Sequence, residues 1–280
     1  MRFLLKLIAV SRNTEIPVNY QYPLSAAIYK ILNRADEKYS AFLHERGYGK
    51  GFKLFTFSQL QGPFQIHRDR LTFLEPEVQL HVAFHLPDAA ENFIKGLFAS
   101  QEMEIADRVS RGRFTVRSVE TVKSPFVSTG ASEIISVDVV PISPVVAGLK
   151  NEKGNYDFLS PDDERFPEVI RYNWREKIRT CFDNESADGA MLLAEVMLFE
   201  RPPKSRLMTI KAGTTEETKI RGWMNVGLRL TAERRFIDLI MNAGAGIYNS
   251  LGCGMAGESS AIKRISEKFD SKKRYNEIIP

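Results

Sequence analysis

A tyrosine, a histidine and a lysine that could move protons or neutralise charge lie within one segment near the amino terminus: Tyr29, His44 and Lys53. An imidazole, with an ordinary pKa of about 6.5, can accept and donate a proton near neutrality. An ammonium group can stabilise developing negative charge. A phenol, with an ordinary pKa of about 10, can orient a hydroxyl or share a proton. The segment is therefore a candidate active site, in which Lys50 competes with Lys53 for the role of the lysine.

Two helices and a strand are expected to position these side chains. Apolar residues recur at helical spacing over 24–35, and this stripe leaves Tyr29 facing away from the core. A second helix is expected to start at Asp36 as its N-cap, with His44 also off the apolar face. Lys53 stands at the start of an apolar strand that follows a glycine-rich loop. These patterns also fit a surface histidine, a solvated lysine and a packing tyrosine, so both interpretations stay open.

A second unusual segment lies near the carboxyl end, where five of the 18 glycines fall between Gly244 and Gly257. This density indicates positive φ angles or a close approach by another chain. Neither a dinucleotide-binding fingerprint nor a P-loop fits, because a helix precedes the glycines and no Gly-Lys-Ser/Thr sequence follows. The remaining interpretations are a helix C-cap with a turn, and a nest of amide donors against an RNA backbone.

Two further segments carry basic side chains in patterns that suit RNA contact. In the strand over 113–122, Arg113 and Arg117 alternate with apolar residues, which predicts one basic face. Lys204 and Arg206 lie at the mouth of a predicted hairpin, where basic side chains suit phosphate contacts. A solvated sheet edge guarded by charge and a solvated hairpin are the alternatives.

The composition is that of an ordinary globular protein, with 43% hydrophobic and 26% charged residues. No run is long enough to cross a bilayer and none reads as a signal sequence, so we expect a cytoplasmic protein without membrane contact. The formal net charge of +4 permits an anionic partner without demanding one. Cys181 and Cys253 lack metal-ligand spacing, which indicates neither a disulfide framework nor a metal site.

The order of the predicted elements indicates an α+β fold made of two tandem ferredoxin-like (βαββαβ, RRM-like) domains. We expect an N-terminal domain over 1–125, a C-terminal domain over 131–260 and a basic tail over 261–280, with the boundary within 123–132, where Ser, Pro and Gly accumulate. Strands are predicted over 3–10, 52–60, 64–73, 78–84, 113–122, 134–140, 191–199, 207–211 and 222–230, with a short one after the glycines, and helices over 24–46, 89–99, 163–182 and 232–243.

The two unusual segments together resemble the signature of the CRISPR repeat-RNA endoribonucleases, the Cas-six type within the repeat-associated RNA-binding superfamily. The two motifs stand in the family's order and at its separation, and the middle third of the chain matches only in pattern. Cys253 stands where an aromatic residue is common in the family, which counts against stacking at that point. The residues that carry the resemblance are the first strand (1–4), Tyr20, Gln21, Tyr22, Leu24, Ile28, Tyr29, Leu43, His44, the segment 53–56, Ser58 and the segment 249–255.

The resemblance implies a metal-independent endoribonuclease that cleaves CRISPR precursor RNA within the repeat and so yields mature guide RNA. It implies attack by the 2′-hydroxyl, which leaves a 2′,3′-cyclic phosphate and a 5′-hydroxyl, and it requires no cofactor. Tyr29, His44 and Lys53 are the implied catalytic residues. His44 would transfer a proton as base or acid, Lys53 would stabilise charge on the phosphorane, and Tyr29 would orient the 2′-hydroxyl or share its proton.

CRISPR repeat RNA is thus the expected partner, and other subunits of a CRISPR interference complex and a second copy of the chain are further candidates. The main alternative is a non-cleaving RNA-binding subunit of such a complex, which would share the fold and the glycine loop without needing the catalytic side chains. A nucleotide-binding enzyme is a third possibility. The residues expected to contact RNA are Gly244, Gly246, Ser250, Gly252 and Gly254 of the glycine loop, with Arg113, Arg117, Lys204 and Arg206.

Overall fold

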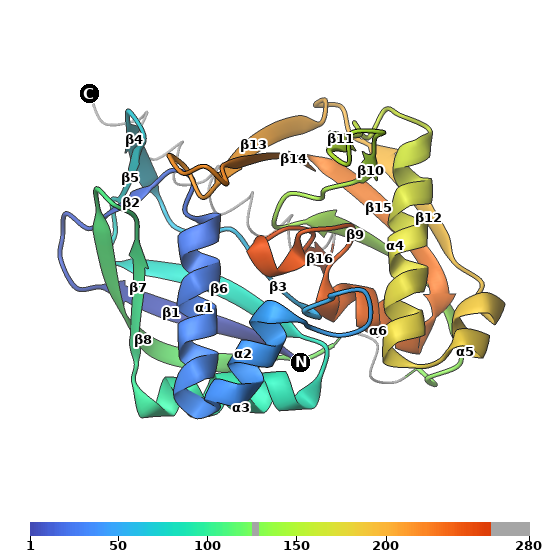
Figure 1. Ribbon diagram of the computed structural model, residues 1–280, viewed down its shortest axis with the longest axis horizontal. Helices are drawn as coiled ribbons and strands as arrows, with labels where there is room; N and C mark the ends of the chain where they lie inside the picture. Colours follow the sequence, from blue (N-terminus) through green and yellow to red (C-terminus); the bar gives the residue numbers. More distant parts are fainter. Residues whose placement is uncertain (125–128, 259–280) are drawn as a thin grey trace, which may run out of the picture.

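The computed structural model describes residues 1–124 and 129–258, which form two units of sheet and helix side by side (Figure 1). Each unit follows the strand–helix–strand–strand–helix–strand order of a ferredoxin-like fold, with the first and third strands at the centre of the sheet. The predicted fold class, α+β with two tandem ferredoxin-like folds, is confirmed. The predicted domain limits stay a prediction, and the basic tail over 261–280 lies outside the described residues.

The first unit is built on an antiparallel sheet in the order β3-β6-β1-β8-β7. Along β1 (Arg2–Ala9), Phe3, Leu5 and Leu7 are buried because alternate side chains of a strand point to the same face. Apolar residues of α1 and α3 form one core with that face. The other elements are β2 (Glu15–Pro17), α1 (Gln21–Ala35), α2 (Glu37–Glu45), β3 (Phe55–Phe57), β4 (Phe64–His67), β5 (Arg70–Phe73), β6 (Glu77–Phe84), α3 (Pro87–Ala99), β7 (Glu102–Ala106) and β8 (Arg111–Val122).

The second unit has a four-stranded sheet in the order β12-β15-β9-β16. Helices α4 and α6 pack on it, and the fully buried Trp174 ties them together because its Nε1 donates to the carbonyl of Phe236 at 2.9 Å. The elements are β9 (Ile134–Pro141), β10 (Gly148–Lys150), β11 (Tyr156–Phe158), α4 (Arg165–Cys181), α5 (Asn184–Gly189), β12 (Leu193–Leu198), β13 (Lys204–Ile210), β14 (Thr218–Met224), β15 (Val226–Glu233), α6 (Arg234–Ala243), the short 3₁₀ helix η1 (Asn249–Leu251) and β16 (Ala256–Glu258).

Two predicted strands differ from the structure because single residues take positive φ angles. The strand predicted over 222–230 is divided at Asn225, with φ of 59° and a side-chain amide that donates to the carbonyls of Arg201 and Pro202. Asparagine tolerates this conformation, so the chain passes from the β13–β14 hairpin into the central sheet there. The strand predicted over 52–60 is observed only as β3, and it begins no earlier than Phe55 because Leu54 has φ of 54°.

The two units meet where the amino-terminal strand and β3 approach the glycine-rich segment. Arg2 donates through one guanidinium nitrogen to the carbonyls of Met241 at 2.5 Å and Ala256 at 2.8 Å. The Thr56 hydroxyl donates to the carbonyl of Cys253 at 2.9 Å. Since β3 and η1 are also in contact, residues that are far apart in sequence border one site between the units (Figure 1).

Candidate active site

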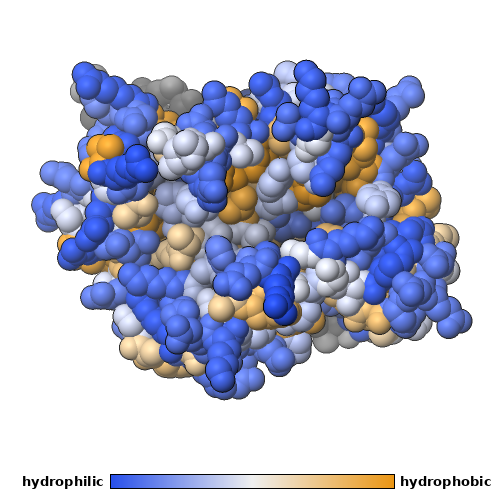
Figure 2. Space-filling model, in the orientation of Figure 1, coloured by the Kyte–Doolittle hydropathy of each residue, from blue (hydrophilic) through white to orange (hydrophobic). Residues whose placement is uncertain are grey.

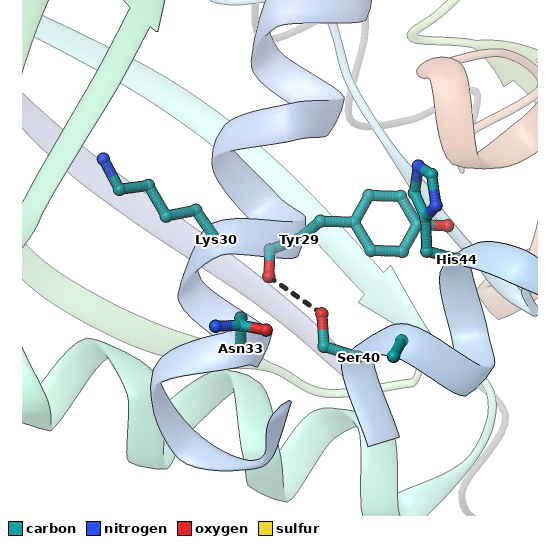
Figure 3. A pocket seen from close by; sticks show the side chains of 6 residues that line it. Tyr29, Lys30, Asn33, Ser40 and His44 are labelled. Atoms are coloured by element: carbon teal, nitrogen blue, oxygen red, sulfur yellow. Dashed lines mark hydrogen bonds between the residues drawn. The ribbon is translucent and has the colours of Figure 1, made fainter. Parts of the chain in front are cut away.

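Tyr29 on α1 and His44 on α2 face each other beside an open cavity of about 300 Å³ (Figure 3). Their ring centroids are 5.1 Å apart, with the rings nearly perpendicular. The turn between the helices sets this geometry: the Asp36 side chain accepts from the amide of Tyr39 at 2.9 Å, as the N-cap prediction required, and the Ser40 hydroxyl donates to the carbonyl of Tyr29 at 3.2 Å. The predicted tyrosine and histidine are therefore brought together.

The prediction that Tyr29 faces away from the core was wrong in part. Its ring is half-buried and packs edge-on against Phe55, at a centroid distance of 5.5 Å, because α2 folds back over this side of α1. Burial raises the pKa of Tyr29 to about 12, while a side-chain hydrogen bond with Ser250 of the glycine-rich segment acts in the opposite direction. The phenol therefore stays protonated at neutral pH and is joined to the second unit.

Lys53 approaches the backbone of His44 from the loop before β3 and lines a neighbouring cavity. Its Nζ donates to the carbonyl of His44 at 2.9 Å, and burial lowers its pKa. Gly47, with φ of 68°, allows this return of the chain: an added Cβ there would lie 2.6 Å from the carbonyl oxygen of Phe52 and 3.0 Å from Cδ of Lys53. The glycine thus both ends α2 and leaves room for the lysine.

Lys50, the competing lysine, is bound elsewhere. Its Nζ lies 2.7 Å from a carboxylate oxygen of Glu176 on α4 and 3.4 Å from the hydroxyl of Tyr172, and its pKa is raised by these two partners. Of the two lysines, Lys53 is the one that contacts His44.

The glycine-rich segment is held by two polar residues to which the sequence reasoning gave no role. Asn249 donates through its side-chain amide to the carbonyls of Ala245 at 3.1 Å and Cys253 at 3.0 Å. Its Oδ1 accepts from the buried Lys177 at 2.7 Å. The signal for Lys177 was present in the sequence, because it falls on the apolar stripe of α4 beside Trp174, where an ordinary lysine does not belong.

The amides of three glycines in this segment are used inside the protein. Those of Gly244, Gly252 and Gly254 donate to backbone carbonyls at 2.8 to 2.9 Å, and all three residues are buried with positive φ angles. Gly246 is buried as well. These contacts show that the glycines shape the backbone of the segment. The half-exposed residues from 247 to 251, Ser250 included, form its accessible edge. Figure 2 shows the face of the molecule seen in Figure 1, which is mostly hydrophilic and has paler side chains in its hollowed middle.

The basic residues predicted to contact RNA lie away from the tyrosine and histidine. Arg113 and Arg117 are exposed on the face of the first sheet opposite α1 and α3, and each lies 3.7 Å from a glutamate oxygen. On β13, Lys204 is exposed, whereas Arg206 is half-buried, stacks over Tyr20 and donates to the carbonyl of Val18 at 3.0 Å. The structure therefore brings none of these four together with the candidate catalytic side chains.

Across residues 1–124 and 129–258, no helix has the length and apolar character that crossing a membrane requires. Within the same part of the chain, no three His, Cys, Asp or Glu side chains gather in a way that could hold a metal ion. The two cysteines there are free, and burial raises the pKa of each thiol to about 12.

Two family models match the chain, one for each unit. Residues 15–120 match the amino-terminal model of the CRISPR-associated protein Cas6, and residues 129–257 match the carboxyl-terminal model. A CRISPR-associated endoribonuclease Cas6 of Methanocaldococcus jannaschii is 29% identical over 260 residues, which cover 92% of this chain and 93% of that protein. A second, from Pyrococcus furiosus, is 24% identical over 259 residues, which cover 91% and 89% of the two chains.

Solved structures share the fold. A Cas6-related protein from Pyrococcus furiosus superposes with a TM-score of 0.73 at 21% identity, covering 92% of this chain and 98% of that one. A structure described as a RAMP protein binding different RNA substrates gives a TM-score of 0.73 at 20% identity, covering 92% and 99%. With both family models matched in order along the two ferredoxin-like units, the chain belongs to the CRISPR-associated Cas6 family.

Proposed function

We propose that this chain is a metal-independent endoribonuclease that cleaves CRISPR precursor RNA within the repeat. The observation that carries the proposal is the contact between the rings of Tyr29 and His44 at the junction of the two units. Lys53 is bound there to the backbone carbonyl of His44, and Ser250 of the second unit interacts with Tyr29. The two curated relatives are named as CRISPR-associated endoribonucleases, which supports RNA cleavage as the reaction class.

The RNA supplies its own nucleophile in the proposed reaction. The 2′-oxygen attacks the neighbouring phosphorus, so a bond from that oxygen to phosphorus forms while the bond from phosphorus to the 5′-oxygen breaks. The 2′-hydroxyl loses its proton and the departing 5′-oxygen gains one. The products end in a 2′,3′-cyclic phosphate and a 5′-hydroxyl, and no water or other reactant is consumed. The protein must therefore move protons and stabilise charge on the phosphorane.

Each of the three side chains has a role that fits its surroundings. His44 is exposed beside the cavity and transfers the proton, a contribution of about 10²- to 10⁴-fold in comparable enzymes. Tyr29 keeps its proton, because burial raises its pKa to about 12, and so acts as a hydrogen-bond donor that orients the 2′-hydroxyl. Lys53 stabilises the charge of the phosphorane through its ammonium group.

RNA contact outside the catalytic side chains is part of the same proposal. The accessible edge of the glycine loop, with Ser250, borders the catalytic group and would bind RNA next to the scissile phosphate. Lys204 is exposed on β13 and suits a phosphate contact. Because Arg113 and Arg117 lie on the opposite face of the first sheet, they would bind a part of the RNA away from the cut.

The test is a cleavage assay on end-labelled repeat RNA from the same host, carried out in EDTA. We expect one cut within the repeat and a cyclic phosphate on the upstream product, identified by mass spectrometry. A matched RNA with a single 2′-deoxynucleotide before the scissile phosphate should bind with unchanged affinity and stay intact. Cleavage of that RNA, or a requirement for magnesium, would contradict the proposed chemistry.

The same assay separates this proposal from a non-cleaving RNA-binding subunit. Such a subunit would bind the intact repeat and leave it uncut at any enzyme concentration, including under single-turnover conditions. Adding purified candidate subunits of an interference complex would then test whether binding serves assembly. Cutting by the chain alone, lost in the His44 variant described below, excludes that alternative.

A further inference from the structure

A second cavity lies beside the candidate active site, between the loop before β3, helix α4 and the glycine-rich segment. Its volume is about 210 Å³. One water occupies about 30 Å³ in the liquid, and pockets for whole drug-sized ligands measure about 300–1,000 Å³. The cavity therefore has room for a single ring system. The side chains that matter for its chemistry are Phe52, Lys53, Asn173, Lys177, Tyr248 and Ser250.

Two of these side chains join the cavity to the catalytic group. Lys53 lines the cavity while its Nζ donates to the carbonyl of His44. Ser250 lines it while its side chain is bonded to that of Tyr29. A group that enters this cavity therefore lies next to whatever the catalytic side chains hold. On the proposed function, that neighbour is the scissile phosphate, and the entering group belongs to an adjoining nucleotide.

Asn173 is a polar side chain whose bonding the protein does not complete. It lies on α4 with an exposed fraction of 8%, and its Oδ1 is buried and has no hydrogen-bond partner among the described residues. Buried side-chain oxygens of native proteins ordinarily accept a hydrogen bond, so an oxygen without one indicates that a donor is missing. A half-turn of the carboxamide exchanges oxygen and nitrogen, so the side chain can present an acceptor or a donor to the cavity.

Two lysines line the cavity, and one of them, Lys177, has no proton left for a ligand. The Nζ of Lys177 donates to the carbonyls of Gly244 at 2.5 Å and Gly246 at 3.1 Å, and to Oδ1 of Asn249 at 2.7 Å. These three acceptors use all three protons of the charged form, and the neutral amine has only two, so neither form has a proton left for a ligand. The Nζ of the other lysine, Lys53, lies at the carbonyl of His44, so a phosphate would bind there, on the side of the catalytic group. The aromatic rings of Phe52 and Tyr248 suit a planar, uncharged ring in the rest of the cavity.

We infer that this cavity binds one nucleobase of the nucleotide next to the scissile phosphate, and that Asn173 reads the hydrogen-bonding edge of that base. The inference rests on the proposed function and deepens it. An amide side chain forms paired hydrogen bonds with the edge of a base, and an aromatic ring stacks on its face. The base must leave its stack to enter, so the RNA is unpaired at this nucleotide.

The test compares repeat RNAs that carry an abasic nucleotide on one side or the other of the scissile phosphate. We expect one of the two abasic RNAs to be cleaved about 10- to 100-fold more slowly than intact RNA by the wild-type protein. Asn173→Ala should cleave intact RNA more slowly by a similar factor and should lose most of this dependence on the base. Tyr172→Phe, a change at the exposed neighbour of Asn173, should keep the wild-type pattern.

A binding measurement keeps the test decisive if Asn173→Ala fails to fold. The fluorescent base 2-aminopurine, placed at the same two positions and bound to His44→Ala, should be protected from acrylamide quenching at one of them. Full accessibility at both positions, or equal base dependence in wild type and Asn173→Ala, would overturn the inference. These outcomes differ from failure of the proposed function, in which wild type would leave the intact RNA uncut.

Discussion

Replacing Lys177 by methionine tests how the glycine-rich segment near the carboxyl end, residues 244–257, is held in place. The lysine is buried to an exposed fraction of 1%, and its Nζ donates to two loop carbonyls and to Asn249. Methionine is unbranched and only one atom shorter than lysine, and it removes all three hydrogen bonds. We expect the loop to shift and to move Ser250, and with it the hydroxyl of Tyr29. A displacement of about 1 Å at a catalytic group can cost about 100-fold in rate, which is the loss of cleavage that we expect.

The same variant has a distinct effect on stability against pH. Burial lowers the pKa of Lys177 from 10.5 to about 7. Between these values the unfolded chain holds a proton on this lysine that the folded protein lacks, so the free energy of unfolding rises with pH. At about 1.4 kcal/mol per pH unit, the lysine adds about 3 kcal/mol from about pH 7 to 9.5. Lys177→Met should lack this increase.

Urea unfolding of both proteins across that pH range, followed by tryptophan fluorescence, measures the difference. Lys38→Met, a change at an exposed lysine on α2, is the matched control and should keep the wild-type pH dependence. Parallel pH dependences in wild type and Lys177→Met would refute the lowered pKa of this lysine. Wild-type cleavage by a folded Lys177→Met would refute its part in positioning the loop.

Three further changes test the remaining geometry. Lys53→Met should reduce the cleavage rate by about 100-fold, the usual cost of losing one charge-stabilising donor. Lys50→Met should cleave at a rate close to that of wild type, because Lys50 is paired with a glutamate on α4. The reverse order of the single-turnover rates would give the catalytic role to Lys50. Gly254→Ala places a Cβ 1.9 Å from a backbone oxygen at φ of 74°, and thermal unfolding should show a larger loss than the roughly 1 kcal/mol expected for Gly213→Ala, where φ is 70° and the space is open. The pKa of Tyr29 is raised from 10.0 to about 12, so between these values the folded protein keeps a proton that the unfolded chain loses. The free energy of unfolding should therefore fall by up to about 3 kcal/mol as the pH rises from 10 to 12. In Tyr29→Phe the free energy of unfolding should fall less over the same pH range.

Local patterns predicted the parts of the structure that depend on neighbouring residues. The capping of α2 by Asp36 and the end of that helix before Gly47 follow from short-range hydrogen bonding and were predicted. The order of strands and helices also sufficed for two ferredoxin-like folds, because few topologies fit that order. For His44 and Lys53, the sequence predicted only that the two residues are close along the chain.

Features that depend on distant segments could not be predicted in the same way. The half-buried state of Tyr29 follows from α2 folding over α1 and from the hydrogen bond with Ser250, more than 200 positions later. Lys177 was recognisable as a lysine on an apolar stripe, but its partners lie in the glycine loop. The sequence around Asn225 has the pattern of one continuous strand, because the alternation of apolar residues does not reveal a single positive φ angle.

Single-turnover cleavage of repeat RNA in EDTA by His44→Ala, with RNA affinity measured in parallel, tests whether the imidazole transfers the proton. We expect a rate reduced by about 10²- to 10⁴-fold with affinity nearly unchanged, because the imidazole is exposed and its loss leaves the fold intact. His67→Ala, a change at an exposed histidine on β4, should cleave as wild type does. Undiminished cleavage by His44→Ala would mean that His44 transfers no proton in the reaction.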